Sequence, residues 1–122
     1  MAESRDPKAI EVQVAEIIRR LQSLADPEKA RLKQEKYGIY AQNAIGVYHK
    51  DLQILAKEFG PDEGLAVALF ETGIYECRLL CSKMYRPKYL TDALMESWVQ
   101  TFENWEITDS FAMGLFAAAA SA

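Results

Sequence analysis

Several features that mark common protein classes are scarce in this chain of 122 residues. Its two cysteines are too few for a disulfide framework, and together with a single histidine they are too few for a zinc site, which needs about four ligands. Six glycines and four prolines exclude a collagen-like or low-complexity polymer. The longest stretch without a charged residue, 110–122, is too short to span a bilayer, so we expect no membrane partner.

The N-terminus carries charged residues with no apolar run behind them, so the sequence predicts no secretory signal. Cys77 and Cys81 are four residues apart, which would place them on one face of a helix. We interpret them as small buried apolar residues, because free cysteine is usually buried. Two unpaired thiols fit a reducing compartment, and the sequence therefore predicts a cytoplasmic protein.

What the chain does contain is the pattern of an all-α protein. Half of its residues are hydrophobic and 11% are aromatic, which excludes a disordered tail. Apolar residues recur at three- and four-residue spacings, and no alternating pattern typical of a β-strand reaches a useful length. The sequence predicts helices of about 11–15 residues joined by short turns. Such helices favour antiparallel pairs stacked as a HEAT-like α-solenoid, with an ordinary helical bundle as the alternative.

Start and stop signals set the expected helix boundaries. Asp6 and Asp26 each precede a proline, which combines an N-capping side chain with proline at the first helical position. Gly38 is expected to end a helix, and Thr91 and Asn104 to cap the N-termini of two later ones. The expected helices cover 7–24, 27–37, 48–59, 61–72, 75–85, 92–102 and the chain from 105 onward, while 39–46 is either a short helix or a loop.

Charge is distributed unevenly along the chain. Residues 1–60 have a net charge of +1, residues 61–122 have a net charge of −5, and no basic residue follows Lys88. A nucleic-acid-binding protein usually presents a basic face, because phosphate contacts dominate affinity. The alternative is an ordinary solvated helix surface. A basic face would draw on five residues of the first half, namely Arg31, Lys33, Lys36, Lys50 and Lys57.

The segment 102–109 holds the residues with the clearest chemistry. Trp105 and Asp109 are four residues apart, so on a helix they point the same way. The indole ring attracts a cation through its π face, and the carboxylate supplies an opposite charge. Together they suit a positively charged alkylated purine, which is already a good leaving group, so that one carboxylate suffices. The alternative is that Trp105 belongs to the core and Asp109 is a solvated acid favoured by the helix dipole.

Four segments follow one another along the chain: DPEKA followed by KY at 26–37, IGV followed by DL and LAKE at 45–58, LFETGIYECR at 69–78, and NWEITD at 104–109. Together they resemble the DNA alkylation repair family of HEAT-like DNA glycosylases, the AlkD-like proteins. The order and spacing of the segments over residues 26–116, rather than any one segment, carry the resemblance.

The resemblance implies a function. Members of this family excise positively charged alkylated purines from duplex DNA without drawing the base into a pocket, so alkylated duplex DNA would be the partner. The aspartate that matches Asp109 is the catalytic carboxylate, the tryptophan that matches Trp105 contacts the sugar of the lesion nucleotide, and the tyrosine that matches Tyr37 lines the same cleft. We also predict that Lys36 and Lys57 contact the DNA backbone. The implied reaction requires no metal or organic cofactor.

Other charged residues in these segments are not assigned to catalysis or to DNA binding. Glu76 and Arg78 match the family and are predicted to be structural, as a helix-start acid and a member of an inter-helix pair. Glu71 and Glu106 are expected to be solvated. Lys50 stands where the family has a proline.

The resemblance also bears on length, because the family runs to about twice this length and its second half supplies a further arginine and tryptophan to the cleft. We therefore expect residues 1–122 to form a single HEAT-like domain, the N-terminal half of a longer one, with little or no activity alone. The last helix is apolar and lacks a C-cap, which fits a fragment, a truncated product or a homo-oligomer formed through that helix. The competing function is a non-catalytic helical-repeat module that binds DNA or a protein partner.

Overall fold

Helices account for most of the protein. The computed structural model describes residues 6–38 and 44–121, apart from the side chains of Tyr37 and Ser121, and these ranges contain no strand. The all-α prediction is therefore confirmed. In chain order the elements are α1 (Pro7–Leu24), α2 (Pro27–Tyr37), α3 (His49–Phe59), α4 (Glu63–Glu71), α5 (Tyr75–Met84), the short 3-10 turn η1 (Pro87–Tyr89), α6 (Asp92–Val99), α7 (Trp105–Asp109), the π-helical η2 (Ser110–Phe116) and α8 (Ala117–Ser121).

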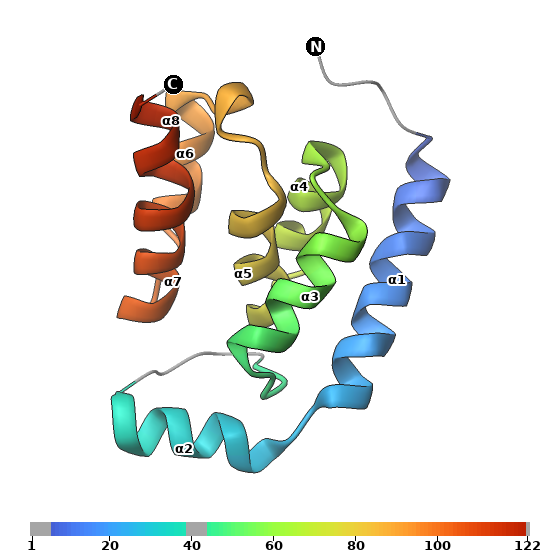
Figure 1. Ribbon diagram of the computed structural model, residues 1–122, viewed down its shortest axis with the longest axis vertical. Coiled ribbons are helices and arrows are strands. Elements are labelled where there is room, and N and C mark those ends of the chain that lie inside the picture. Colours follow the sequence, from blue (N-terminus) through green and yellow to red (C-terminus); the bar gives the residue numbers. More distant parts are fainter. Residues whose placement is uncertain (1–5, 39–43, 122) are drawn as a thin grey trace.

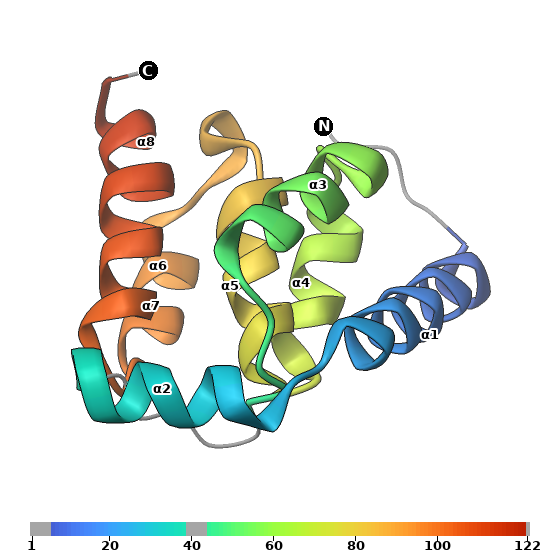
Figure 2. The ribbon, with the colours of Figure 1, turned by 60° about the horizontal axis from the view of Figure 1, so that its bottom comes forward.

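The helices lie side by side in a row. α1 packs against α4, α4 pairs with α5, and α5 packs against both α3 and η2. The continuous run of α7, η2 and α8 lies beside α6 at the far end of the row (Figure 1). α2 does not join the row but crosses one end of it (Figure 2). Packed neighbouring helices agree with a helical-repeat architecture, while their continuation as a solenoid stays a prediction.

The predicted helix caps are confirmed. The side chains of Asp6, Asp26, Thr91 and Asn104 each accept a hydrogen bond of 3.0–3.2 Å from a backbone N–H two or three residues further on. These bonds satisfy N–H groups that have no partner within the helix. Gly38 ends α2 in the left-handed conformation, with φ of 65°. These boundaries are therefore set by local side-chain chemistry.

One expected helix end differs, and one segment that the sequence leaves open is described in part. The helix expected over 92–102 ends at Val99, because the N–H groups of residues 101 and 102 bond to carbonyls only three residues back and the chain turns. The ambiguous segment 39–46 is non-helical from residue 44 onward, and residues 39–43 lie outside the described part of the chain.

The core lies where α1, α3, α4, α5 and η2 meet. Each fully buried aliphatic or aromatic side chain contributes about 1.5–3 kcal/mol by leaving water. Cys77 and Cys81 belong to this core as free thiols, which confirms their apolar interpretation, and no three potential metal ligands cluster within the described ranges. The largest buried side chains are Ile17, Leu21, Leu52, Leu55, Leu65, Leu69, Tyr75, Leu80, Met84, Ile107, Phe111 and Leu115.

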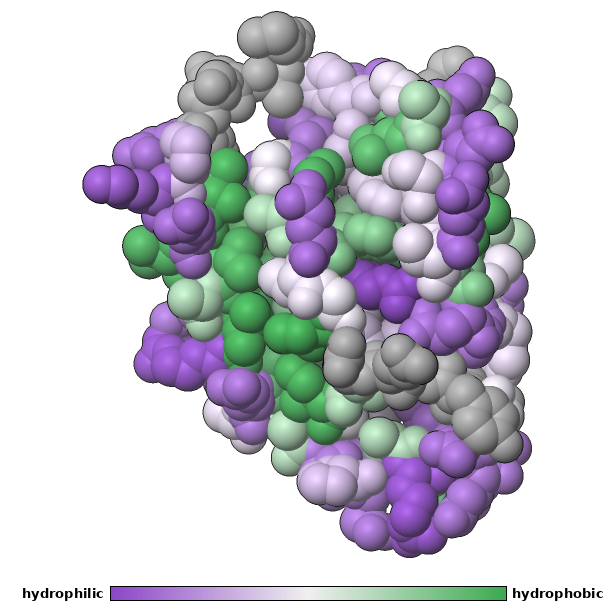
Figure 3. Space-filling view, turned by 180° about the vertical axis from the view of Figure 1, so that it is seen from behind, coloured by the Kyte–Doolittle hydropathy of each residue, from purple (hydrophilic) through white to green (hydrophobic). Residues whose placement is uncertain are grey.

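α1 is held mainly by its apolar stripe. Ile10, Val14 and Ile18 are partly buried against the core, and apolar side chains form a continuous band on the face seen from behind (Figure 3). α1 is also the longest helix among the described residues, and neither it nor any other described helix is long and apolar enough to cross a membrane.

Candidate functional site

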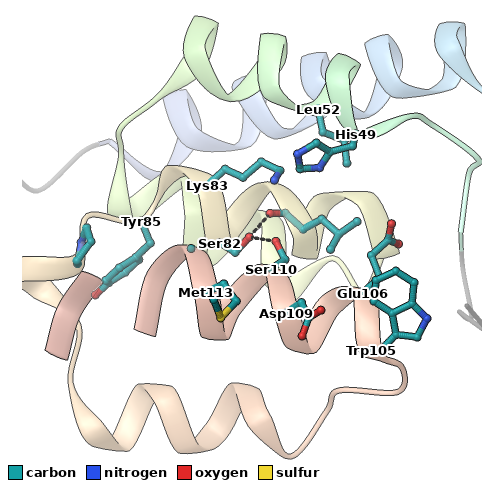
Figure 4. Close-up of a pocket in the computed structure, with 13 residues that line it drawn as sticks. His49, Leu52, Ser82, Lys83, Tyr85, Trp105, Glu106, Asp109, Ser110 and Met113 are labelled. Carbon is teal, nitrogen blue, oxygen red and sulfur yellow. Dashed lines mark hydrogen bonds between the residues drawn. The ribbon is translucent and has the colours of Figure 1, made fainter. Parts of the chain in front are cut away.

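A cleft of about 610 Å³ opens between α3, α5 and the run of α7 and η2 (Figure 4). Its walls combine charged and polar side chains with apolar ones, so a ligand here would meet both. The side chains that matter for its chemistry are His49 from α3, Lys83 from α5, Trp105, Glu106 and Asp109 from α7, and Met113 from η2.

Trp105 and Asp109 are the first and last residues of α7, and both line the cleft, as their spacing predicts. Trp105 is 52% exposed, so the alternative that places it in the core is wrong; Trp98, at 4%, is the core tryptophan. The Asp109 carboxylate is exposed at the cleft and forms no hydrogen bond or ion pair within the described residues. It is therefore available to a ligand.

The N-terminus of α7 is fixed by a buried phenol of α5. The Tyr75 hydroxyl lies 3.0 Å from Asn104 Oδ1 and 2.8 Å from Glu106 Oε1, so its proton is shared between two acceptors. Desolvation, followed by the hydrogen bond to Glu106, raises the pKa of Tyr75. Tyr75 thus stays a neutral donor, and it orients the capping residue of the helix that carries Asp109.

Arg78, also on α5, holds the loop that leads into α7. Its Nη1 donates to Glu103 Oε1 at 2.6 Å, and its Nη2 donates to the Thr101 carbonyl at 2.9 Å and to the Thr101 hydroxyl at 3.0 Å. The guanidinium also lies over the Phe70 ring, 5.3 Å from its centroid. The structure thus gives Arg78 a structural role, as the sequence predicts.

Glu106 overturns the expectation that it is solvated. Its Oε2 lies 2.9 Å from Lys33 Nζ of α2, and the two side chains are only 20% and 16% exposed. The ion pair with Lys33 and the hydrogen bond from the Tyr75 hydroxyl together hold Glu106 in place beside Trp105. The pairing joins residues 73 positions apart, whereas helix periodicity reports only on neighbours three or four residues away.

His49 and Lys83 are cleft residues that the sequence analysis did not find. Figure 4 shows the Lys83 side chain beside the His49 imidazole. Burial and then the positive charge of Lys83 lower the pKa of His49, and burial lowers the pKa of Lys83. Within the described residues, Lys83 has no ion pair with a carboxylate. Two groups that can carry positive charge therefore face the cleft that contains Asp109.

Comparison with known proteins decides the family. A family model described as DNA alkylation repair enzyme matches residues 17–121, nearly the whole chain. The chain belongs to this family. Searches of the curated proteins and of the solved structures gave no match. Membership confirms the family resemblance and indicates a role in DNA repair.

In this member of the DNA alkylation repair enzyme family, contacts among three of the four segments link α5 to the start of α2. Glu76 is 2% exposed and accepts the N–H groups of Ile45 and Gly46 at 2.8 and 2.9 Å. The Gly46 carbonyl in turn accepts the Asp26 N–H at 3.0 Å. Gly46 has φ of 91°, and a Cβ there would lie 2.2 Å from the Asp26 carbonyl oxygen. Only glycine fits this position.

The helix widens directly after Asp109. η2 adopts π-helical hydrogen bonding, which inserts a wider turn into the run from α7 to α8. Such segments occur frequently at functional sites. Its first residue, Ser110, lies 2.6 Å from the Ser82 hydroxyl of α5, while Phe111 is fully buried. The wider turn thus has firm anchors on α5, and no sequence signal marks it.

The remaining predicted site residues lie elsewhere. Tyr37 ends α2, but its side chain lies outside the described part of the structure, so its place in the cleft stays a prediction. Lys36 is exposed on α2 and does not line the cleft. Lys57 lines a second groove, of about 710 Å³, which also includes Lys50 and Lys83. Lys83 lines both hollows and so connects them.

Proposed function

We propose that the chain carries the catalytic carboxylate of a DNA glycosylase, which excises positively charged alkylated purines from duplex DNA. Membership of the DNA alkylation repair enzyme family supports this class of substrate. The observation that carries the proposal is the pairing of Trp105 and Asp109 at one cleft, with a carboxylate that no described residue engages. A carboxylate without an internal partner is free to stabilise charge that develops in a substrate.

The reaction needs only one carboxylate because the leaving group is already cationic. When the C1′–N bond breaks, the purine takes both bonding electrons and leaves as a neutral base. The sugar becomes oxocarbenium-like, and the Asp109 carboxylate stabilises its positive charge while Trp105 packs against the sugar. Water then adds to C1′, and its proton passes to Asp109 or to solvent, which gives a free base and an abasic site. Ordinary glycoside hydrolysis instead uses two carboxylates.

The test is base release from duplex DNA carrying a methylated purine, by the protein encoded by the complete reading frame that contains this chain. We expect Asp109→Asn to lower the release rate by about 100-fold or more, the usual effect of losing one transition-state contact. The matched control is Asp92→Asn, an exposed acid at the start of α6 that does not line the cleft. Release by the Asp109→Asn variant at the unmodified rate would show that the assigned role is wrong.

A second candidate is a non-catalytic helical-repeat module, which the net charge of −4 and the acidic second half of the chain favour. Binding of undamaged duplex that weakens steeply with salt, without base release by the complete protein, would establish a DNA-binding module instead of a glycosylase. Absence of DNA binding at low salt, together with self-association, would indicate a module that binds a protein.

A further inference from the structure

Three described lysines share one groove. Lys50, Lys57 and Lys83, which line the second groove, form no ion pair within the described residues. The groove has no acidic residue in its lining, in a chain with 18 acidic residues. By contrast, an ion pair with a carboxylate neutralises each described arginine, namely Arg19, Arg20, Arg31, Arg78 and Arg86. Three of the described unpaired lysines therefore line this one groove, which we call the lysine groove.

The lysine groove runs along α3 and leads into the cleft. Lys50 and Lys57 are seven positions apart on α3, which is two helical turns, so both face the same side about 10 Å apart along the axis. Lys83 reaches from α5 into both the lysine groove and the cleft that holds Asp109. A polyanion lying in the groove would thus be led towards the carboxylate.

The junction has a second feature that attracts anions. His49 and Lys50 are the first two residues of α3, and no side chain caps this helix terminus. The exposed N–H groups and the dipole of a helix N-terminus favour a phosphate. Lys83 lies beside His49 in the lining of this cleft, so an anion bound to both would offset the repulsion of two positive charges (Figure 4).

We propose that Lys83 and His49 hold a phosphate of a nucleic-acid strand at the junction of the lysine groove and the cleft, and that Lys50 and Lys57 hold phosphates further along the same strand. A nucleic-acid strand is the occupant that fits, because its charges are spaced along a line, as these lysines are. The inference rests on the proposed function only for the identity of the strand as DNA.

Binding of the phosphate would be coupled to protonation of His49. Burial is the largest influence on the imidazole and lowers its pKa. Among charged groups, Lys83 of α5 lowers this pKa, Glu106 of α7 raises it, and Lys33 of α2 lowers it. Asp109 of α7 lines the same cleft. A phosphate stabilises the protonated imidazole and so raises this pKa. Strand binding therefore tightens as pH falls through the interval between the two pKa values of His49, without and with the strand.

The test uses the single histidine of the chain as a reporter, since its imidazole gives one resolved signal in an NMR pH titration. An undamaged duplex oligonucleotide should raise the His49 pKa by about half a unit or more, a shift typical of a nearby opposite charge. Lys83→Gln should abolish this rise, and Lys83→Arg should keep it. Lys88→Gln, which changes a lysine outside both hollows, is the matched control and should show the full rise. Circular dichroism confirms that each variant is folded.

Four outcomes would overturn the inference. They are no rise with the duplex, an equal rise in the Lys83→Gln variant, an equal rise with inorganic phosphate at the same phosphate concentration, and an equal rise with polyglutamate. The third outcome would identify a free-phosphate site, and the fourth an acidic protein partner. Because the DNA in this titration is undamaged, the titration does not depend on base excision. A failed excision assay therefore does not bear on strand binding, and a failed titration does not bear on excision.

Discussion

Lys33 Nζ lies 2.9 Å from Glu106 Oε2 and joins α2 to the helix that carries Trp105 and Asp109. Among the described side chains of α2 none is fully buried, so no buried apolar side chain anchors this helix. Polar contacts take over that role, through the ion pair near its middle and the Gly46 backbone at its start.

Loss of this ion pair should destabilise the protein measurably. Lys33→Met leaves a mostly buried carboxylate without its cation, and we expect the free energy of unfolding to fall by about 2 kcal/mol. Urea denaturation measures the change. Lys36→Met on the same helix removes an exposed lysine and should change the free energy by less than about 0.5 kcal/mol. Equal losses in the two variants would contradict the role given to Glu106.

Gly46 and Gly38 form a matched pair for testing the link between α5 and α2. Both have positive φ, but a Cβ at Gly46 would collide with the Asp26 carbonyl, whereas a Cβ at Gly38 meets no described atom within 4 Å. Gly38→Ala should therefore cost about 1–2 kcal/mol, from the left-handed conformation alone. Gly46→Ala should cost clearly more, because backbone must also move. Thermal unfolding compares the two, and a smaller effect at Gly46 would refute the contact.

Acid should weaken the protein partly through Glu63. Arg86, by its guanidinium and its backbone N–H, holds the pKa of Glu63 below the usual value of 4.5. A lowered folded-state pKa means that this stabilisation is present above the unfolded pKa and is lost as pH falls through the folded one. Glu63→Gln should therefore destabilise most at pH 7 and progressively less below about pH 4.5.

Urea titrations at several pH values measure this difference. The matched control is Glu71→Gln, an exposed acid that ends the same helix and forms no ion pair within the described residues. A stability difference between the Glu63→Gln variant and the unmodified protein that stays constant from pH 7 to low pH would rule out the assigned coupling.

The two tryptophans should differ sharply in fluorescence. Trp105 is half exposed at the cleft, while Trp98 is buried among Phe70, Tyr85 and Phe111. Acrylamide should therefore quench the native protein substantially and the Trp105→Phe variant weakly, and the variant's emission should shift to shorter wavelength. A quenching constant unchanged by Trp105→Phe would mean that the indole is not open to solvent.

Local chemistry explains what the sequence predicts well. The caps at Asp6, Asp26, Thr91 and Asn104 depend on side chains two or three residues from the N–H groups they satisfy. The joint position of Trp105 and Asp109 depends on a four-residue spacing in the same way. Patterns of this kind are visible in a single sequence because both partners lie within one helical turn.

The features of the site that the sequence does not predict depend on contacts between distant segments. Glu106 has the pattern of a solvated acid on its own helix, and only the approach of α2 gives it a partner. Lys83 and His49 meet because α5 packs against α3, a contact that no local periodicity encodes. The wider turn after Asp109 likewise has no marker in a segment that reads as ordinary helix.

The grouping of Lys50, Lys57 and Lys83 in one groove has a consequence for how a polyanion would arrive. Measured from far away, the protein carries a charge of −4 and repels DNA. Nearer, the lysines of the groove would attract DNA while the acidic residues elsewhere repel it, so the field would turn the molecule before contact. Encounters would then be selected by orientation, with the groove side leading, and this selection fades as salt shortens the range of the field. Average charge is therefore a poor guide to which ligands this protein admits.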